Sequence, residues 1–200
     1  MANVTITDLT PGTTLIGTEL FEAVQTASSV KISADQIKDY VLDLAFMQAT
    51  SLVDQTAVVN TPTAVRLGTV DFSNDISIVN DGSGNPTRIT FANAGLYEVS
   101  ISLQLDNTDA ADHGLRVWQR KNGSDLASSS SLISVPKAAD GGTTIFELNT
   151  LFNATAPGDY LQYMFAVSNV AVTLRYDAAQ ASPYIAPAVP SAIFIASQVN

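Results

Sequence analysis

The sequence predicts an all-β, antiparallel sandwich preceded by a small N-terminal α/β segment. Three observations predict the sandwich. From about Leu52 onward, short apolar runs follow one another between clusters of Gly, Pro, Asn and Asp, without a helical pattern between them. The run from Leu96 to Leu105 alternates apolar and polar residues, which is typical of a strand with one buried face. The pair Asn122-Gly123 between two such runs favours a type I′ hairpin turn.

The first 45 residues have a different pattern. Two short apolar runs, Glu19–Gln25 and Val30–Ile32, predict a hairpin around a small polar link. The stretch Ser33–Gln36 then matches a capping box, and Ile37, Tyr40, Val41 and Leu44 follow at helical spacing. A hairpin with one short helix buries too little surface to be very stable alone. We therefore expect residues 1–45 to dock onto another surface.

Residues 46–51 are predicted to be a linker, and residues 52–200 to form the sandwich. The expected strands are Gln55–Asn60, Val65–Phe72, Ile76–Val79, Arg88–Ala92, Leu96–Leu105, Leu115–Lys121, Leu126–Val135, Thr143–Phe152, Tyr160–Ser168, Val172–Tyr176 and Ala192–Val199. Many short strands without helices between them predict a sandwich or a barrel.

Composition excludes several functional classes. Charged residues make up 14% of the chain, against roughly 25% in an average soluble domain, so we expect a surface rich in small polar residues or partly covered by neighbours. With 19 acidic and 9 basic residues the formal net charge is −10, which opposes binding to nucleic acid or anionic lipid. The chain has no cysteine, which excludes disulfides and thiolate metal sites. No signal sequence or membrane-spanning run is apparent, so we expect synthesis in the cytoplasm and no membrane insertion.

Two strands are predicted to lie at a subunit interface. Tyr160–Val167 has large apolar residues on both faces, and Ala192–Val199 places Ile193, Ile195 and Val199 on one face and Phe194 on the other. An antiparallel strand that is apolar on both faces has to bury its outer face, commonly against another subunit. The expected interface residues are Tyr160, Met164 and Phe194.

Four motifs in the second part of the chain carry a family resemblance. They are Gly95-Leu96-Tyr97-Glu98-Val99-Ser100, Val117-Trp118-Gln119-Arg120-Lys121-Asn122-Gly123-Ser124-Asp125, Pro157-Gly158-Asp159-Tyr160-Leu161-Gln162 and Pro187-Ala188-Val189-Pro190-Ser191-Ala192-Ile193. In this order they resemble the C-terminal jelly-roll module of many tailed-phage virion proteins. That module is similar to the trimeric jelly rolls of C1q and tumour-necrosis-factor-like proteins. The resemblance covers roughly residues 52–200 and implies a jelly roll assembled as a homotrimer.

The N-terminal segment resembles a short leader found ahead of diverse phage fibre-like proteins. The resemblance lies in Val4–Leu9, Glu19–Val24 and Val30–Ile37. It implies that the segment anchors the chain to the virion. The residues that would make this attachment are Ile6, Leu9, Phe21, Val24, Ile32, Ile37, Tyr40 and Val41.

Together these features predict a non-enzymatic phage virion protein. It would be a trimeric fibre-like appendage or a capsid decoration protein, with capsid, neck or tail proteins as partners and the virion as its location. The alternative is a host-attachment adhesin, the receptor-binding tip of a tail fibre, whose trimer binds surface glycans. A polysaccharide-degrading enzyme is a third hypothesis, but no catalytic signature is present.

Several residues have both a chemical and a structural interpretation. His113, the single histidine, lies in the polar stretch Asp106–Gly114, which could suit a hard cation but lacks the EF-hand pattern; we expect a solvated loop. Trp118, flanked on one strand face by Arg116 and Arg120, could be a sugar platform or a stacked ladder covering the sheet; we favour the ladder. Tyr176 and Tyr184 are further candidates for receptor contact. No cofactor or metal site is predicted.

Overall fold

The computed structural model describes residues 20–25, 28–35, 37 and 44–199. The chain divides into two compact units, Met1–Leu44 and Ala45–Asn200.

The first unit contains an antiparallel hairpin. Strand β1 (Leu20–Gln25) pairs with β2 (Ser28–Ser33), with Leu20 opposite Ser33 and Gln25 opposite Ser28. The hairpin predicted from the sequence is therefore confirmed. The backbone is helical at Ala34, Asp35 and Ile37, and the rest of the expected helix lies outside the described residues.

The second unit is a sandwich of two antiparallel sheets. Sheet I has the order β12-β8-β15-β3-β5, with β14 also paired to β8. Its strands are β3 (Phe46–Ser51), β5 (Thr69–Asn74), β8 (Gly95–Asn107), β12 (Thr143–Ala154), β14 (Val172–Leu174) and β15 (Ala192–Val199). Sheet II has the order β10-β9-β13-β7-β6, with β11 paired to β9 and β4 to β13. Its strands are β4 (Thr63–Ala64), β6 (Ile76–Asn80), β7 (Pro86–Phe91), β9 (His113–Lys121), β10 (Ser124–Asp125), β11 (Ser131–Val135) and β13 (Tyr160–Val167).

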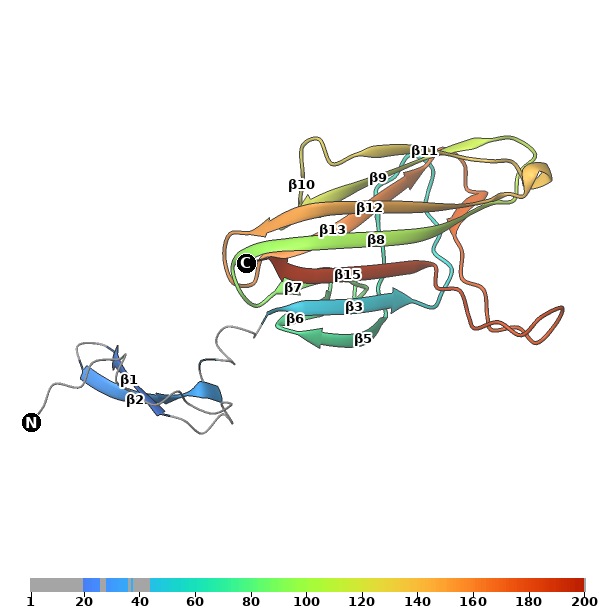
Figure 1. The fold of residues 1–200 in the computed structure, drawn as a ribbon. Coiled ribbons are helices and arrows are strands. Elements are labelled where there is room, and N and C mark those ends of the chain that lie inside the picture. Colours follow the sequence, from blue (N-terminus) through green and yellow to red (C-terminus); the bar gives the residue numbers. More distant parts are fainter. Residues whose placement is uncertain (1–19, 26–27, 36, 38–43, 200) are drawn as a thin grey trace, which may run out of the picture. The chain divides into compact units, whose positions relative to one another are not determined.

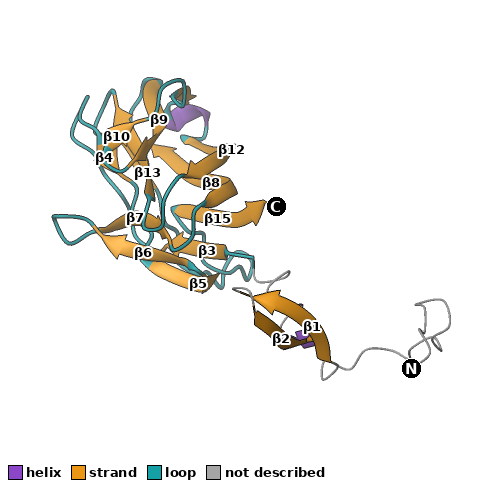
Figure 2. Ribbon diagram, turned by 90° about the vertical axis from the view of Figure 1, so that its left-hand side faces the viewer, coloured by secondary structure: helices purple, strands orange, loops and turns teal. Residues whose placement is uncertain are grey.

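The chain winds between the two sheets as in a jelly roll (Figures 1 and 2). It passes from β3 in sheet I to β4 in sheet II, and later from β8 to β9, back to β12, and across again to β13. Apart from the short 3-10 helix η2 (Ala138–Asp140), no helix lies in the described part of this unit. The predicted all-β, antiparallel jelly-roll sandwich is confirmed.

Two boundaries differ from the sequence prediction. The predicted linker at residues 46–51 is wrong, because this segment is β3, hydrogen-bonded to β15 on one side and β5 on the other. Its inward apolar side chains are Met47 and the small Ala49, so the alternating apolar pattern is too short to identify a strand from the sequence. The predicted strand Gln55–Asn60 is also wrong: it forms one isolated bridge, from Gln55 to Leu174, because the buried Gln55 side chain bonds to loops instead.

The core fills the space between the sheets. The inward residues of β8 alternate as the sequence predicts, and Tyr97 packs against Phe91 of the opposite sheet with ring centroids 4.4 Å apart. Phe152 also stacks on Phe91, with ring centroids 4.9 Å apart. Polar groups inside the core are paired: the Gln119 amide donates to the hydroxyls of Thr150 and Tyr163. Burial raises the pKa of the Tyr163 hydroxyl.

Two of the recognised motifs meet at one end of sheet II. Asn122 (φ 49°) and Gly123 (φ 83°) both have positive φ, as the predicted type I′ turn requires. The Asn122 amide donates to Asp159 Oδ1 at 2.8 Å, while the Tyr160 amide nitrogen donates to Asn122 Oδ1 at 2.9 Å. Lys121 Nζ lies 2.8 Å from Asp159 Oδ2. These motifs are therefore a clip that joins the β9–β10 turn to the loop before β13.

Candidate functional site

The outer face of sheet I exposes large apolar side chains on all five of its main strands. They are Ile145 and Leu151 on β12, Leu96 on β8, Ile195 and Val199 on β15, Phe46 on β3 and Phe72 on β5. The register places Ile195 between Ser100 and Gln48, and Leu151 beside Glu98, so these side chains share one surface. Small polar residues separate them. A surface of this kind is typical of a protein contact rather than of a catalytic site.

Phe46 and Phe72 form one end of this surface. Their ring centroids lie 6.1 Å apart, and both rings are exposed. On β8 and β12, toward the other edge of the sheet, the charged residues Glu98 and Glu147 also face outward, and Glu98 Oε1 accepts a hydrogen bond from the Asn149 amide at 3.2 Å. The sheet I face is thus apolar and acidic.

On sheet II, long side chains of the same chain cover part of the outer face, while Leu132 on β11 stays exposed. Arg116, Trp118 and Arg120 follow one another along β9, alternating with the inward residues Val117 and Gln119. The sequence therefore places these three side chains on one face correctly.

Trp118 and Arg120 are held by one carboxylate. Trp118 Nε1 donates to Asp125 Oδ1 at 2.8 Å, and Arg120 Nε donates to the same oxygen at 2.7 Å. These bonds, from Arg120 first and Trp118 second, lower the pKa of Asp125. The tether favours the interpretation of Trp118 as part of a ladder that covers the sheet.

The predicted interface residues need correction. Phe194 is fully buried in the core, with its ring centroid 6.0 Å from that of Tyr163, so it cannot contact another subunit. Alternation along β15 places Ile193, Ile195 and Val199 outside instead, the reverse of the predicted facing.

The two interface residues predicted on β13 are also covered by their own chain. Met164 is 3% exposed, and its partners on the adjacent strands are Trp118 and Ala64. The Tyr160 ring lies under the Arg88 guanidinium, whose carbon is 4.9 Å from the ring centroid. β13 is apolar on both faces because it is the central strand of its sheet and side chains of its own chain, such as Arg88 over Tyr160, cover its outer residues.

Half of the eight predicted anchoring residues lie outside what the structure describes. Ile6, Leu9, Tyr40 and Val41 fall outside the described residues. Phe21 and Val24 belong to β1 and Ile32 to β2, with Phe21 opposite Ile32; Ile37 follows the hairpin and is exposed.

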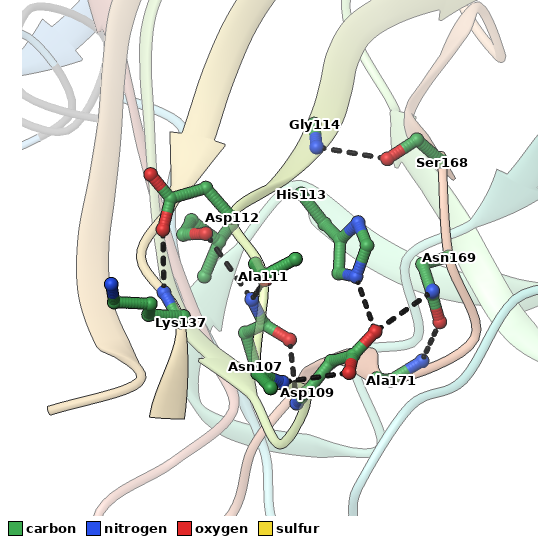
Figure 3. Close-up of polar contacts among 12 residues, drawn as sticks. Asn107, Asp109, Ala111, Asp112, His113, Gly114, Lys137, Ser168, Asn169 and Ala171 are labelled. Carbon is green, nitrogen blue, oxygen red and sulfur yellow. Dashed lines mark hydrogen bonds and ion pairs between the residues drawn. The ribbon is translucent and has the colours of Figure 1, made fainter. Parts of the chain in front are cut away.

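His113 is part of a polar cluster at the start of β9 (Figure 3). Its Nε2 lies 2.7 Å from Asp109 Oδ2, which also accepts a hydrogen bond from the Asn169 amide at 3.2 Å. The bond to His113, followed by one from the Ala110 backbone, lowers the pKa of Asp109. The buried Asn107 amide donates to the Ala111 carbonyl oxygen at 2.9 Å. The cluster joins three loops, and the side chains of Asn107, Asp109, His113 and Asn169 each have a hydrogen-bond partner in the protein.

Metal binding has no support in this cluster. In the described part of the chain, no three His, Cys, Asp or Glu side chains gather closely enough to hold a metal ion. Nor do its helical residues form a segment able to span a membrane.

A second candidate lies on an extended loop at the same end of the sandwich. Residues 177–189, which we call the arm, run out and back between β14 and β15, with isolated bridges pairing Asp177 with Val189 and Gln180 with Ala186 (Figure 1). Ala45, where the sandwich unit begins, lies at the opposite end, beside Gln198 near the end of β15. The arm therefore extends from the end of the sandwich opposite Ala45.

The arm encloses a pocket of about 320 Å³, which we call the arm pocket. It is lined by Arg175, Asp177, Ala178, Gln180, Tyr184, Ala186, Pro187 and Val189. Of the three predicted receptor residues, only Tyr184 lies here; the Tyr176 side chain is not in the lining, although its backbone nitrogen donates to Asp54 nearby. Trp118 belongs to the outer face of sheet II. The three residues therefore do not form one site.

Comparison with known proteins finds similarity in the fold. Murine APRIL at pH 5.0 is 10% identical to this chain, with 78% of this chain and 99% of that chain covered and a TM-score of 0.49. The globular domain of zebrafish complement 1qA protein is also 10% identical, with 78% and 98% covered and a TM-score of 0.43. No family model matches the chain. No curated protein matches it either. These structures assign no role to any residue here.

Proposed function

We propose that this chain is a non-enzymatic structural protein of a phage virion, in which the jelly roll assembles as a homotrimer and the N-terminal unit attaches the trimer to the particle. The observation that carries the proposal is the apolar outer face of sheet I. A monomer would leave Leu151, Ile195, Phe46 and Phe72 in water together, whereas an interface removes them from it. The proposed number of subunits, three, and the proposed location in a virion rest on the sequence resemblance.

A cyclic trimer joins two different patches of the same chain. The sheet I face is one of them. Its charged residues Glu98 and Glu147 are acidic, so the partner patch must bring hydrogen-bond donors or leave these carboxylates at a solvated rim.

The assembly test compares two leucines. Leu151 on sheet I is 62% exposed and Leu132 on sheet II is 67% exposed, so both tolerate a carboxylate in the monomer. Light scattering on the full chain should give a trimer for the wild type and for Leu132→Asp. It should give a monomer at micromolar concentration for Leu151→Asp, because three carboxylates would be buried at the interface. A monomeric wild type would contradict the proposed assembly.

The anchoring role is tested by deletion. Removing residues 1–44 keeps Ala45, whose carbonyl oxygen accepts from the Gln198 backbone nitrogen and whose own nitrogen donates to the Gln198 side chain. We expect the truncated protein to remain folded and trimeric but to be absent from purified particles. Incorporation at normal copy number would place the anchor in the sandwich instead.

A further inference from the structure

We propose that the arm pocket binds an uncharged sugar unit of a polysaccharide. The residues that line it come from one chain, and the site therefore does not depend on the proposed trimer. It goes beyond the structural function because it gives the protein a ligand.

The charges in the pocket are already balanced. Arg175 Nη1 lies 3.2 Å from Asp106 Oδ1, and Nη2 lies 2.8 Å from Asp177 Oδ1. These contacts, with Asp177 the stronger, raise the pKa of Arg175, so the guanidinium stays charged and paired. Residues 178–191 contain no charged side chain. The two charged residues of the lining are Arg175 and Asp177, so an anionic ligand would meet the Asp177 carboxylate and a cation would meet the guanidinium. The pocket therefore favours a ligand without charge.

The pocket nevertheless offers many hydrogen bonds. A guanidinium has five N–H donors. Its Nε directs one to Asp177 and its Nη1 directs one to Asp106, while Nη2 lies close to the same Asp177 oxygen, so at least two donors remain for a ligand. Within the described residues, the Gln180 amide and the Tyr184 hydroxyl have no hydrogen-bond partner, although both groups line the pocket. Donors and acceptors placed side by side suit hydroxyl groups, each of which donates one bond and accepts others.

The remaining lining is small and apolar. Ala178, Ala186, Pro187 and Val189 form the walls, and the Tyr184 ring is 65% exposed. A tyrosine ring offers an apolar face beside a polar tip, which matches a sugar ring with CH groups on its faces and hydroxyls at its edge. The volume of about 320 Å³ lies at the small end of ligand pockets, which span about 300–1,000 Å³. A small unit at the end of a glycan chain would fit.

The site is also well placed for a polymer on another surface. The arm lies at the end of the sandwich away from Ala45. A trimer would present three copies of the pocket, and multivalent contact with a repeating polysaccharide raises the overall affinity well above that of one site.

The test is saturation-transfer NMR on the full chain with glucose, galactose, mannose and N-acetylglucosamine, each against glucuronate. We expect at least one neutral sugar to bind with a Kd of about 1–10 mM, as an open pocket with few contacts allows. Glucuronate should bind at least about tenfold more weakly, because its carboxylate approaches that of Asp177 in the lining. No saturation transfer to any of the four neutral sugars overturns the proposal. Stronger binding of glucuronate overturns it too, and points to the arginines of sheet II.

Variants locate the binding. Tyr184→Ala and Gln180→Ala should each weaken the neutral sugar at least about tenfold. The control is Ile185→Ala, because Ile185 is adjacent, 89% exposed and absent from the pocket lining; it should bind like the wild type. Unchanged binding in Tyr184→Ala would place the sugar elsewhere. Light scattering on the same samples reports the oligomeric state, so failure of the sugar site and failure of the proposed assembly are distinguishable.

Discussion

The two outer faces of the sandwich are built from similar strands but differ in how far their apolar side chains are covered by the same chain. Sheet II has the more apolar strand, β13, yet Met164 on its outer side is covered by its own chain. Sheet I has strands whose outer residues are mostly small and polar, yet side chains such as Leu151 and Ile195 remain open to solvent. The apolar content of one strand therefore does not identify an interface. What matters is whether neighbouring strands of the same chain supply a cover.

The largest expected difference in stability is between a substitution on the buried side of β15 and one on its exposed side. Phe194→Asp should leave the chain unfolded, because it removes a buried ring, at about 3–5 kcal/mol, and adds a carboxylate without a partner in the core. Ile195→Asp, one residue later on the exposed side, should remain folded but monomeric. Circular dichroism melts and light scattering on the two variants make the comparison. A folded, cooperative Phe194→Asp protein would contradict the facing of β15.

The next effect concerns the clip that fastens sheet II. Lys121 first, and Asn122 second, lower the pKa of Asp159 below its ordinary value of about 3.9. A depressed folded-state pKa adds stability that is complete above about pH 4 and is lost as the pH falls further. Asp159→Asn should therefore have a lower urea midpoint at pH 7 and lose less stability than the wild type between pH 4 and pH 2. Parallel acid curves for the two proteins would show that Asp159 is not the responsible group.

A smaller effect tests the cover on sheet II. Trp118→Phe keeps an aromatic ring beside Met164 but removes the hydrogen bond to Asp125. We expect a loss of about 0.5–1.5 kcal/mol in the free energy of unfolding, with the oligomeric state unchanged. Dissociation of the assembly in this variant would move the interface to sheet II.

The smallest effect is expected at His113. His113→Ala removes the contact with Asp109, but Asn169 still donates to that carboxylate. Particle yield and infectivity should be unchanged, with less than about 1 kcal/mol lost in unfolding experiments at pH 7. Infectivity that falls while particle yield stays normal would reveal a chemical role for this histidine.

Local sequence patterns were sufficient for much of the fold. Alternation predicted the inward side of β8, and Asn122-Gly123 predicted the turn after β9, because both depend on neighbouring residues only. β3 was missed since its strand character comes from hydrogen bonds to β15 and β5, which lie far along the chain or beyond the next turns. Tyr184 was a candidate from the sequence. Arg175 and Gln180, which line the same pocket, were not, because the path of the arm brings these residues together.

The pattern of residues along the chain thus determines that this protein is an antiparallel β-sandwich without thiol chemistry and with a strongly acidic balance. Alternation and turn residues are local properties, and composition does not depend on folding. Which apolar residues stay exposed was decided by strand order and register. The same is true of the arm pocket, where Arg175 meets Asp106 of a distant strand. Phe194 and Ile195 are both large and apolar in the sequence, and only pairing of β15 between β8 and β3 sends the first into the core and leaves the second outside.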